Sequence, residues 1–399
     1  MGNEARVIRS LQKEIDRVKN GVLLSIKLLN KDEMNILIDD TSKVVDKFYD
    51  IVYKACEKAP EHVIIKTPHL TKLYVIIPDM ARIGEKLAYL IYSQVQLYVD
   101  SDCPESYLKC AVSSIKFFPE RTSNVEKLLS LMGYGMYVSK DQSYYYCYDD
   151  NPVDIEDLRK RNCDLNLLRY SLFKKKAQFA YQPIVDRKSG HVEYYECLLR
   201  VLDENNNLIS VGSMIKDAEI KGLIHIVDLT AMEMAISELD KDKDITLSVN
   251  VSNIGVLNQR FLRRIESLLK KYDVANRLII EITETSLNQD FSITKKFIDT
   301  LRSCGCRFSL DDFGSGFTSF RQLLDLSIDI IKIDGSYIRS VLNDRHSESF
   351  VKALIKLASD LEIKTVAEFV ENGKIAKFLI DMEIDSMQGN FFLPASATR

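Results

Sequence analysis

The chain lacks long apolar runs: no segment approaches the roughly 20 residues that cross a bilayer, and the N-terminus has no hydrophobic signal core. Its eight cysteines lack the C-x-x-C spacing of common zinc and redox motifs. Positive charge is not in excess, since the formal net charge is −4 and basic residues alternate with acidic ones. We therefore expect a cytoplasmic protein with reduced thiols, with no membrane segment in this chain and no duplex nucleic acid partner.

The most informative motif that is present is Asp311-Asp312-Phe313-Gly314-Ser315-Gly316, which follows a short apolar segment. Adjacent side chains on a strand point to opposite faces, so both acids can serve one site only where the strand ends and the backbone turns. Gly314 and Gly316 permit such a turn. Two carboxylates at that place suit a divalent metal, although the motif alone is also typical of an ordinary polar turn.

The C-terminal half alternates short β-rich runs with longer amphipathic stretches such as 291–303 and 347–361. This alternation indicates βα units and a parallel sheet, and about eight units in roughly 235 residues fit a closed (β/α)8 barrel. The expected strands are 178–185, 192–199, 246–251, 278–282, 307–310, 328–333, 363–367 and 384–387.

Polar residues stand at the ends of most of these strands, directly after apolar residues: Glu196, Asn250, Glu281, Asp311, Lys332, Glu368 and Gln388. Catalytic groups of such barrels gather at the C-terminal ends of the strands. Burial there is costly unless the groups are paired or coordinated, which favours a hard-cation site. An oxygen-rich set without histidine or cysteine favours magnesium or manganese over zinc, and the lysine suits a charge-balancing or water-orienting role.

These motifs resemble those of the EAL-domain phosphodiesterases, which hydrolyse the bacterial second messenger cyclic di-GMP. The resemblance covers about residues 164–399. The matching segments are Tyr181-Gln182-Pro183-Ile184, Glu196-Cys197-Leu198-Leu199-Arg200, Ser248-Val249-Asn250-Val251-Ser252, Glu281-Ile282-Thr283-Glu284, Asp311-Asp312-Phe313-Gly314, Ile331-Lys332-Ile333-Asp334, Ala367-Glu368-Phe369-Val370-Glu371 and Gln388-Gly389.

The resemblance implies a two-metal site for Mg²⁺ or Mn²⁺ that hydrolyses cyclic di-GMP to linear pGpG. The implied metal ligands are Glu196, Asn250, Glu281, Asp311 and Asp312. The implied catalytic residues are Lys332, which positions the attacking water, Glu368, which supports the water shell of the second metal, and Glu196. Gln182, Leu198, Arg200 and Gln388 would contact the nucleotide, and Glu284 would brace the loop from Asp312 to Ser319.

Four residues depart from the usual pattern of this family. Cys197 replaces the alanine of the name motif, Val201 stands where a tryptophan is common, Phe369 replaces a glycine, and Asn390 replaces an aromatic residue. We expect Cys197 to be tolerated, and the other three to alter the shape of the pocket. None of the four removes an implied metal ligand.

The N-terminal half is similar, in the order of its elements only, to a degenerate GGDEF domain. Strands are expected at 22–28, 62–65, 73–77 and 110–117, with helices near 41–58, 79–98 and 125–136. The position of the signature hairpin, His69 to Leu73, has neither the glycine pair nor the acids of that family, and Lys27 takes the place of a metal-binding aspartate. We expect no diguanylate cyclase activity.

The predicted domain order is an N-terminal helix (1–24), the smaller α+β GGDEF-like domain (25–150), a polar linker (151–163) and the EAL barrel (164–399). Ile8, Leu11, Ile15, Val18 and Val22 follow three- and four-residue steps, which suits a short coiled-coil seam or a helix packed on its own domain. Because many EAL enzymes act as dimers, we expect a homodimer.

Three functions remain open at this level: an active phosphodiesterase with a regulatory N-terminal domain, a catalytically inactive cyclic di-GMP receptor, and a protein-interaction scaffold. The complete set of implied metal ligands favours the enzyme.

Overall fold

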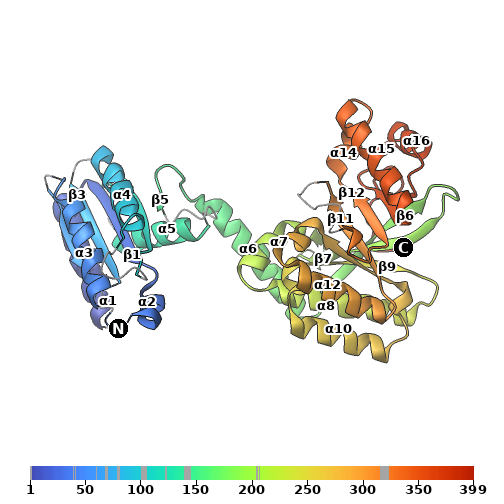
Figure 1. Ribbon diagram of the computed structural model, residues 1–399, viewed down its shortest axis with the longest axis horizontal. Coiled ribbons are helices and arrows are strands. Elements are labelled where there is room, and N and C mark those ends of the chain that lie inside the picture. The colour runs from blue at the N-terminus through green and yellow to red at the C-terminus, as the bar shows by residue number, and fades with distance from the viewer. Residues whose placement is uncertain are drawn as a thin grey trace. The chain divides into compact units, whose positions relative to one another are not determined.

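The chain folds into two compact units, Met1–Leu158 and Arg159–Arg399, as the computed structural model in Figure 1 shows. A helix, α6 (Ile155–Phe173), includes the boundary between them and much of the segment predicted as a polar linker. The structure describes residues 2–38, 40, 42–59, 61–67, 71–78, 81–99, 106–121, 124–138, 145–203, 205, 207–314 and 323–399.

A five-stranded sheet forms the centre of the N-terminal unit, in the order β2-β3-β1-β4-β5. Its strands are β1 (Gly21–Leu28), β2 (Val63–Lys66), β3 (Lys72–Pro78), β4 (Cys110–Phe117) and β5 (Tyr145–Cys147). β1 pairs antiparallel with β3 and β4, and β4 pairs parallel with β5. The four predicted strands are confirmed within one or two residues at each end. The predicted hairpin position, His69 to Leu73, lies partly outside the described residues.

Helices cover both faces of this sheet, because its strands are apolar on both sides. The helices are α1 (Gly2–Val18), α2 (Lys31–Leu37), α3 (Ser42–Cys56), α4 (Ala81–Gln96) and α5 (Val125–Val138). Side chains of α3 and α4 pack with Val22, Leu24 and Ile26 on one face. Those of α1 and α5 pack with Leu23 on the other face, as the two-residue period of a strand requires.

The N-terminal helix α1 packs on its own unit. Leu11 and Ile15 are fully buried in a cluster with Leu23 and residues of α5. The helix ends at Val18, and Val22, which the seam pattern had included, belongs to β1. Of the two alternatives for this segment, the structure therefore has the helix packed on its own domain.

An eight-stranded closed barrel forms the centre of the C-terminal unit. The sheet order is β6-β14-β13-β12-β11-β10-β9-β7-β8, and a further pairing of β6 with β7 closes the ring and leaves β8 (Leu208–Ser210) outside it. The ring strands are β6 (Gln178–Asp186), β7 (Val192–Leu202), β9 (Leu247–Val251), β10 (Leu278–Thr283), β11 (Arg307–Phe313), β12 (Ile330–Ile333), β13 (Lys364–Ala367) and β14 (Ser386–Met387). The eight predicted strands are all present.

The prediction of eight βα units in a parallel sheet was wrong for the first strand. β6 and β7 form an antiparallel hairpin, and β6 is also antiparallel to β14. Only the residues between Asp186 and Val192 connect the two strands, whereas a parallel crossover needs about a dozen residues. The remaining neighbours in the ring pair in parallel.

The later strands are followed by helices. These are α7 (Gly212–Ile220), α8 (Ile224–Lys241), α9 (Asn253–Val256), α10 (Gln259–Lys271), α11 (Glu284–Gln289), α12 (Phe291–Ser303), α14 (Gly335–Ser340), α15 (Arg345–Asp360) and α16 (Gly373–Asp381). Inside the barrel, Ile184, Tyr194, Ile279, Ile330 and Val366 form a buried layer.

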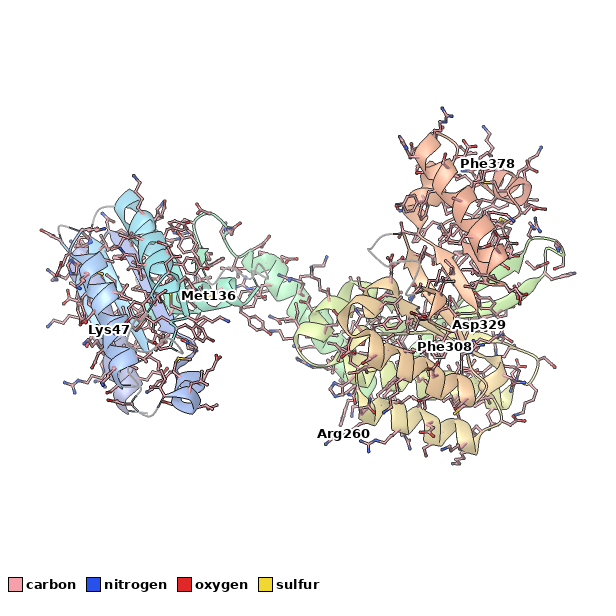
Figure 2. All side chains as sticks on the ribbon, in the orientation of Figure 1. Lys47, Met136, Arg260, Phe308, Asp329 and Phe378 are labelled. Carbon is pink, nitrogen blue, oxygen red and sulfur yellow. The ribbon has the colours of Figure 1, made fainter. Side chains whose placement is uncertain are left out.

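Figure 2 labels Phe308 and Asp329 close together, at the starts of β11 and β12. The Asp329 carboxylate accepts a 2.8 Å hydrogen bond from the Phe308 amide, and it forms an ion pair with the Arg302 guanidinium at 2.5 Å. These contacts tie the two strands together at the end of the barrel opposite Asp311 and Lys332. Across the described residues, no helix is long and apolar enough to cross a membrane.

Candidate functional site

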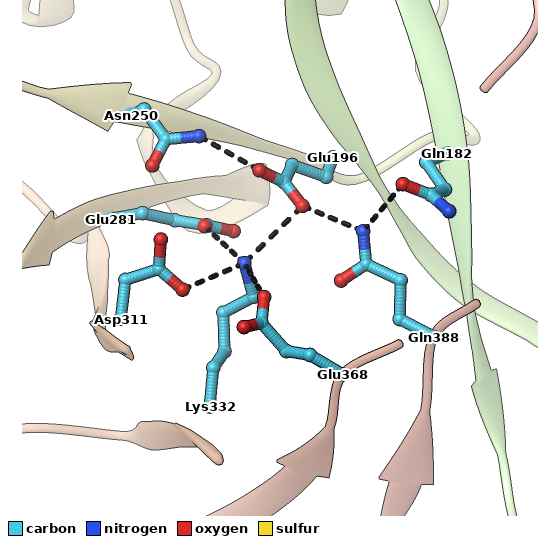
Figure 3. Close-up of polar contacts among 8 residues, drawn as sticks. All are labelled: Gln182, Glu196, Asn250, Glu281, Asp311, Lys332, Glu368 and Gln388. Carbon is cyan, nitrogen blue, oxygen red and sulfur yellow. Dashed lines mark hydrogen bonds and ion pairs between the residues drawn. The ribbon is translucent and has the colours of Figure 1, made fainter. Parts of the chain in front are cut away.

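Four carboxylates converge on one lysine at the C-terminal ends of the barrel strands (Figure 3). Lys332 Nζ lies 2.8 Å from oxygens of both Glu281 and Glu368. It also lies 3.0 Å from Asp311 Oδ1 and 3.2 Å from Glu196 Oε2. The lysine is 1% exposed, so this cluster is closed to bulk water on the lysine side. Five different strand ends thus supply one charged site, as the sequence pattern predicted for this edge of the barrel.

Amide side chains hold Glu196 from both of its oxygens. Asn250 Nδ2 donates to Glu196 Oε1 at 2.8 Å, and Gln388 Nε2 donates to Oε2 at 2.6 Å. The Gln388 amide also donates to Gln182 Oε1 at 3.1 Å. Because Asn250 uses its nitrogen here, its amide oxygen lies on the side away from Glu196 (Figure 3).

Asp311 and Asp312 reach the same site through a β-bulge. Leu310 pairs with Ile331 and Phe313 with Ile333, so two residues of β11 lie opposite the single residue Lys332 of β12. Asp312 has φ +54°, a left-handed conformation that is uncommon for a residue with a side chain. The prediction that the strand ends before the two acids was wrong, because β11 runs on to Phe313 and the bulge redirects the side chains.

The site holds more negative charge than Lys332 balances. Burial alone would lower the pKa of Lys332, but the carboxylates around it, Asp311 foremost, hold that pKa well above its usual value. Burial, together with Glu196 and Asp311, raises the pKa of Glu281 to about 8 despite the lysine. Burial and the neighbouring Asp311 raise the pKa of Asp312 to about 6.

The residues present fit divalent cations with oxygen ligands. One oxygen each of Asp311, Asp312 and Glu368 lie within 4.8 Å of one another. Glu281 Oε1 is buried and has no hydrogen-bond partner among the described residues. A buried carboxylate oxygen without a partner is costly unless a ligand or ion completes it, and hard cations take such ligands. The donor set therefore suits Mg²⁺ or Mn²⁺, as expected from the sequence.

A cavity of about 860 Å³ opens beside the charged cluster. Gln182, Leu198, Arg200 and Gln388, the predicted nucleotide contacts, all line it. Gln388 Oε1 is buried there without a hydrogen-bond partner in the described part of the chain. The cavity thus combines unsatisfied polar atoms with an apolar wall, as small-molecule sites do.

The four unusual residues divide into two groups. Cys197, Phe369 and Asn390 line the cavity, and burial raises the pKa of the Cys197 thiol well above its usual value. Val201 lies instead in an apolar cluster with residues of α6, α7 and α8. The expectation that Val201 shapes the pocket was therefore wrong: it fills the core beneath α7, whereas Phe369 and Asn390 stand at the cavity itself.

Glu284 is buried at the start of α11 and accepts a 3.1 Å hydrogen bond from the Gly314 amide. The predicted brace for the loop from Asp312 to Ser319 is therefore in contact with the first part of that loop. Residues 315–319 lie outside the described residues.

Sequence reasoning missed Asp228, which is buried and lines the cavity. It accepts a 2.6 Å hydrogen bond from the Ser252 hydroxyl, and burial raises its pKa to about 6. The sequence signal for Asp228 is a single acid among the mostly apolar residues at the start of α8. Tyr194 was also missed: its buried hydroxyl has no hydrogen-bond partner in the described chain, and only the fold places it close to the charged cluster.

Comparisons with known proteins agree with this geometry. A family model described as EAL domain matches residues 166–395. The curated protein "Cyclic di-GMP phosphodiesterase PdeF" of Escherichia coli is 31% identical over 238 residues, which make up 58% of this chain and 32% of that protein. The solved structure "PaMucR Phosphodiesterase, c-di-GMP complex" is 28% identical, has a TM-score of 0.54, and covers 58% of this chain and 97% of its own.

A third comparison extends over nearly the whole chain. The Vibrio cholerae structure titled "LapD S helix-GGDEF-EAL (bound to c-di-GMP)" covers 98% of this chain and 93% of its own, with a TM-score of 0.55 and 20% identity, so the likeness concerns the fold alone. The chain spans less than half the length of the curated relatives it matches.

Proposed function

Because this chain belongs to the EAL-domain family, we propose that its barrel is a metal-dependent phosphodiesterase that hydrolyses cyclic di-GMP to linear pGpG. The observation that carries the proposal is the cluster of carboxylates at the strand ends, with the buried Glu281 oxygen that has no partner among the described residues. A scaffold or a receptor would be free to replace such a costly group.

In this proposal Glu196, Asn250, Glu281 and Asp311 would hold one ion, and Asp311 and Asp312 the second. The grouping of Asp311, Asp312 and Glu368 oxygens within 4.8 Å of one another supports the second position. Two bound ions would activate the attacking water and stabilise the attacking and leaving oxygens of the displacement. Lys332 balances part of the carboxylate charge. With the ions bound, it would orient that water, and Glu368 would support the water shell of the second ion. Hydrogen bonds from Asn250 and Gln388 keep the Glu196 carboxylate in one orientation. A residue that serves both as metal ligand and as catalytic residue needs such a fixed orientation.

Recognition of the dinucleotide is assigned to the cavity beside the metal ligands. Arg200 supplies a positive charge for a phosphate, and Gln182 and Gln388 supply amide groups for polar edges. The apolar part of the wall, which includes Leu198, suits the faces of the bases.

The N-terminal unit is proposed as a degenerate GGDEF-like regulatory domain without cyclase activity, in a protein that acts as a homodimer. Support comes from its strand order and from the absence of metal-binding acids in the sequence at Lys27 and at His69 to Leu73. The proposed domain division is 25–150 for this domain and 164–399 for the barrel.

The test is turnover of cyclic di-GMP by the purified full chain with Mn²⁺ or Mg²⁺, followed by chromatography. We expect metal-dependent formation of pGpG that EDTA abolishes. Tight binding of cyclic di-GMP without product would instead support the receptor, and neither binding nor turnover would support the scaffold. Glu196→Ala and Lys332→Ala serve as variants: turnover equal to that of the parent in both would contradict the assignment of the site.

A further inference from the structure

We propose that Tyr337 is a positioning residue for the metal site, because its hydroxyl holds the carbonyl of Gly314 and thereby fixes the backbone that carries Asp311 and Asp312. The inference rests on the proposed function of that site. Tyr337 lies on α14, five residues after Lys332, and no sequence motif indicates a role for it.

The Gly314 residue is held on both sides of its backbone. Tyr337 Oη donates to the Gly314 carbonyl at 3.0 Å, and the Gly314 amide donates to Glu284 Oε2 at 3.1 Å. The two partners come from different elements, α14 and α11, which the barrel fixes independently. The backbone two residues beyond Asp312 therefore has little freedom to move.

Such a clamp is needed because the preceding backbone is strained. Asp312 has φ +54°, which is strained for a residue with a side chain, and such strain persists only where the surroundings determine the conformation. On the β12 side, Lys332 alone lies opposite Asp311 and Asp312. On the other side, Asp311 forms the last pair of the β10 ladder, with Thr283, so regular pairing does not extend to Asp312. The next residue with regular pairing is Phe313, and the clamp acts directly after it.

The ring that presents the hydroxyl is itself fixed. Tyr337 stacks on Phe350 of α15 with ring centroids 4.2 Å apart and an angle of 25° between the planes. Gly314 lies against this pair so closely that an added Cβ would come within 2.6 Å of the Phe350 ring and 2.9 Å of the Tyr337 ring. Gly314 also has φ +101°, so both its space and its conformation exclude a side chain. A preset hydroxyl loses little entropy when it binds the carbonyl.

Tyr337→Phe tests the role, because it removes the hydroxyl and keeps the stacked ring. The probe is Mn²⁺ alone, titrated into the full chain and followed by the electron paramagnetic resonance signal of free Mn²⁺. We expect the dissociation constant of the more weakly bound of the two Mn²⁺ ions to rise about fivefold. The loss of one hydrogen bond corresponds to a factor of this size. In turnover, the Mn²⁺ concentration for half-maximal rate should rise by the same factor, while KM for cyclic di-GMP at saturating Mn²⁺ stays unchanged.

Tyr146→Phe is the matched control, because Tyr146 Oη also donates to a backbone carbonyl, that of Asn151, but in the N-terminal unit. It should leave both Mn²⁺ dissociation constants as in the parent. If the parent binds two ions and Tyr337→Phe binds them equally well, the role of Tyr337 is wrong and the two-metal site stands. If the parent itself binds no Mn²⁺, the proposed metal site and the role of Tyr337 are both wrong.

Discussion

The barrel unit and the N-terminal unit are both built from a sheet covered by helices, yet they treat charge differently. The acidic and basic side chains buried in the described part of the barrel unit are Glu196, Asp228, Glu281, Glu284, Lys332 and Glu368. In the described part of the N-terminal unit, the buried polar residues are Asn30, Ser106, Ser113 and Ser114, all of them uncharged. Among the described residues, both units thus bury polar groups, but only the barrel unit buries carboxylate and lysine side chains.

Two strand ends show what this difference means. Asn30 follows β1 and is fully engaged by backbone: its amide nitrogen donates to the Tyr107 carbonyl at 2.8 Å, and its oxygen accepts from the Lys109 amide at 3.0 Å. Glu281, at the end of β10, has one oxygen without any partner among the described residues. A buried polar side chain whose groups are all satisfied by the fold is structural, whereas one with an unsatisfied carboxyl oxygen indicates a ligand.

The largest effects on turnover and on stability are expected from single substitutions of Glu281 and of Asn30. Glu281→Gln should lower cyclic di-GMP turnover by at least about 10²-fold, since it removes a charged ligand from the metal site. It should leave the metal-free stability nearly unchanged at pH 7, because burial holds the pKa of Glu281 at about 8 and the side chain is largely neutral there.

Asn30→Ala should do the reverse: it should destabilise the N-terminal unit by about 1–3 kcal/mol through two orphaned backbone groups and leave turnover near that of the parent. Steady-state kinetics and urea unfolding measure both. A large loss of turnover in Asn30→Ala would break the comparison.

The next effect concerns the N-terminal unit alone. Leu11→Ala should lower its free energy of unfolding by about 2–5 kcal/mol, because Leu11 is fully buried against its own sheet. Calorimetry at two protein concentrations is the measurement. A change in unfolding temperature that depends on protein concentration would favour a coiled-coil seam between chains over packing within one chain. The control is Arg6→Ala, which replaces an exposed residue of the same helix.

A smaller effect is the pH dependence of Mn²⁺ binding. The pKa of Asp312 is raised to about 6 and that of Glu281 to about 8, so protons occupy these ligands at low pH and must leave when an ion binds. Mn²⁺ affinity should therefore increase from pH 6 to pH 8, by up to about tenfold per pH unit for each displaced proton, and level off above. Glu281→Gln should lose the upper part of this dependence. A flat profile in the parent would show that neither carboxylate is a ligand.

The smallest effect concerns backbone strain at the site, where Asp312 and Phe369 both have positive φ. Phe369 has φ +52° and lines the cavity, with the Arg339 guanidinium 4.7 Å from its ring centroid. Phe369→Gly should be more stable than Phe369→Ala by about 1 kcal/mol, because only glycine adopts this conformation without cost. Chemical unfolding of the two variants measures the difference, and equal stabilities would mean that the strain is relieved elsewhere.

The sequence predicted the strands and the polar residues at their ends because buried strands read as apolar runs and a single charge after them stands out. It did not predict the hairpin of β6 and β7, although the short connection from Asp186 to Val192 was a usable sign. The bulge at Asp312 and the contact of Tyr337 with Gly314 depend on how β11, β12 and α14 meet in space. No local pattern contains that information.

The closed ring of strands has a consequence for the order in which the molecule is made. β14 joins β13 to β6, and the Gln388 side chain that follows it bonds Glu196, 192 positions earlier in the chain. Contacts of such long range form slowly, because the entropy of closing the intervening chain must be overcome first. Until β14 is in place, the ring stays open and Glu196 lacks the hydrogen bond from Gln388. The last strand to be made therefore both closes the barrel and completes the polar contacts of the site.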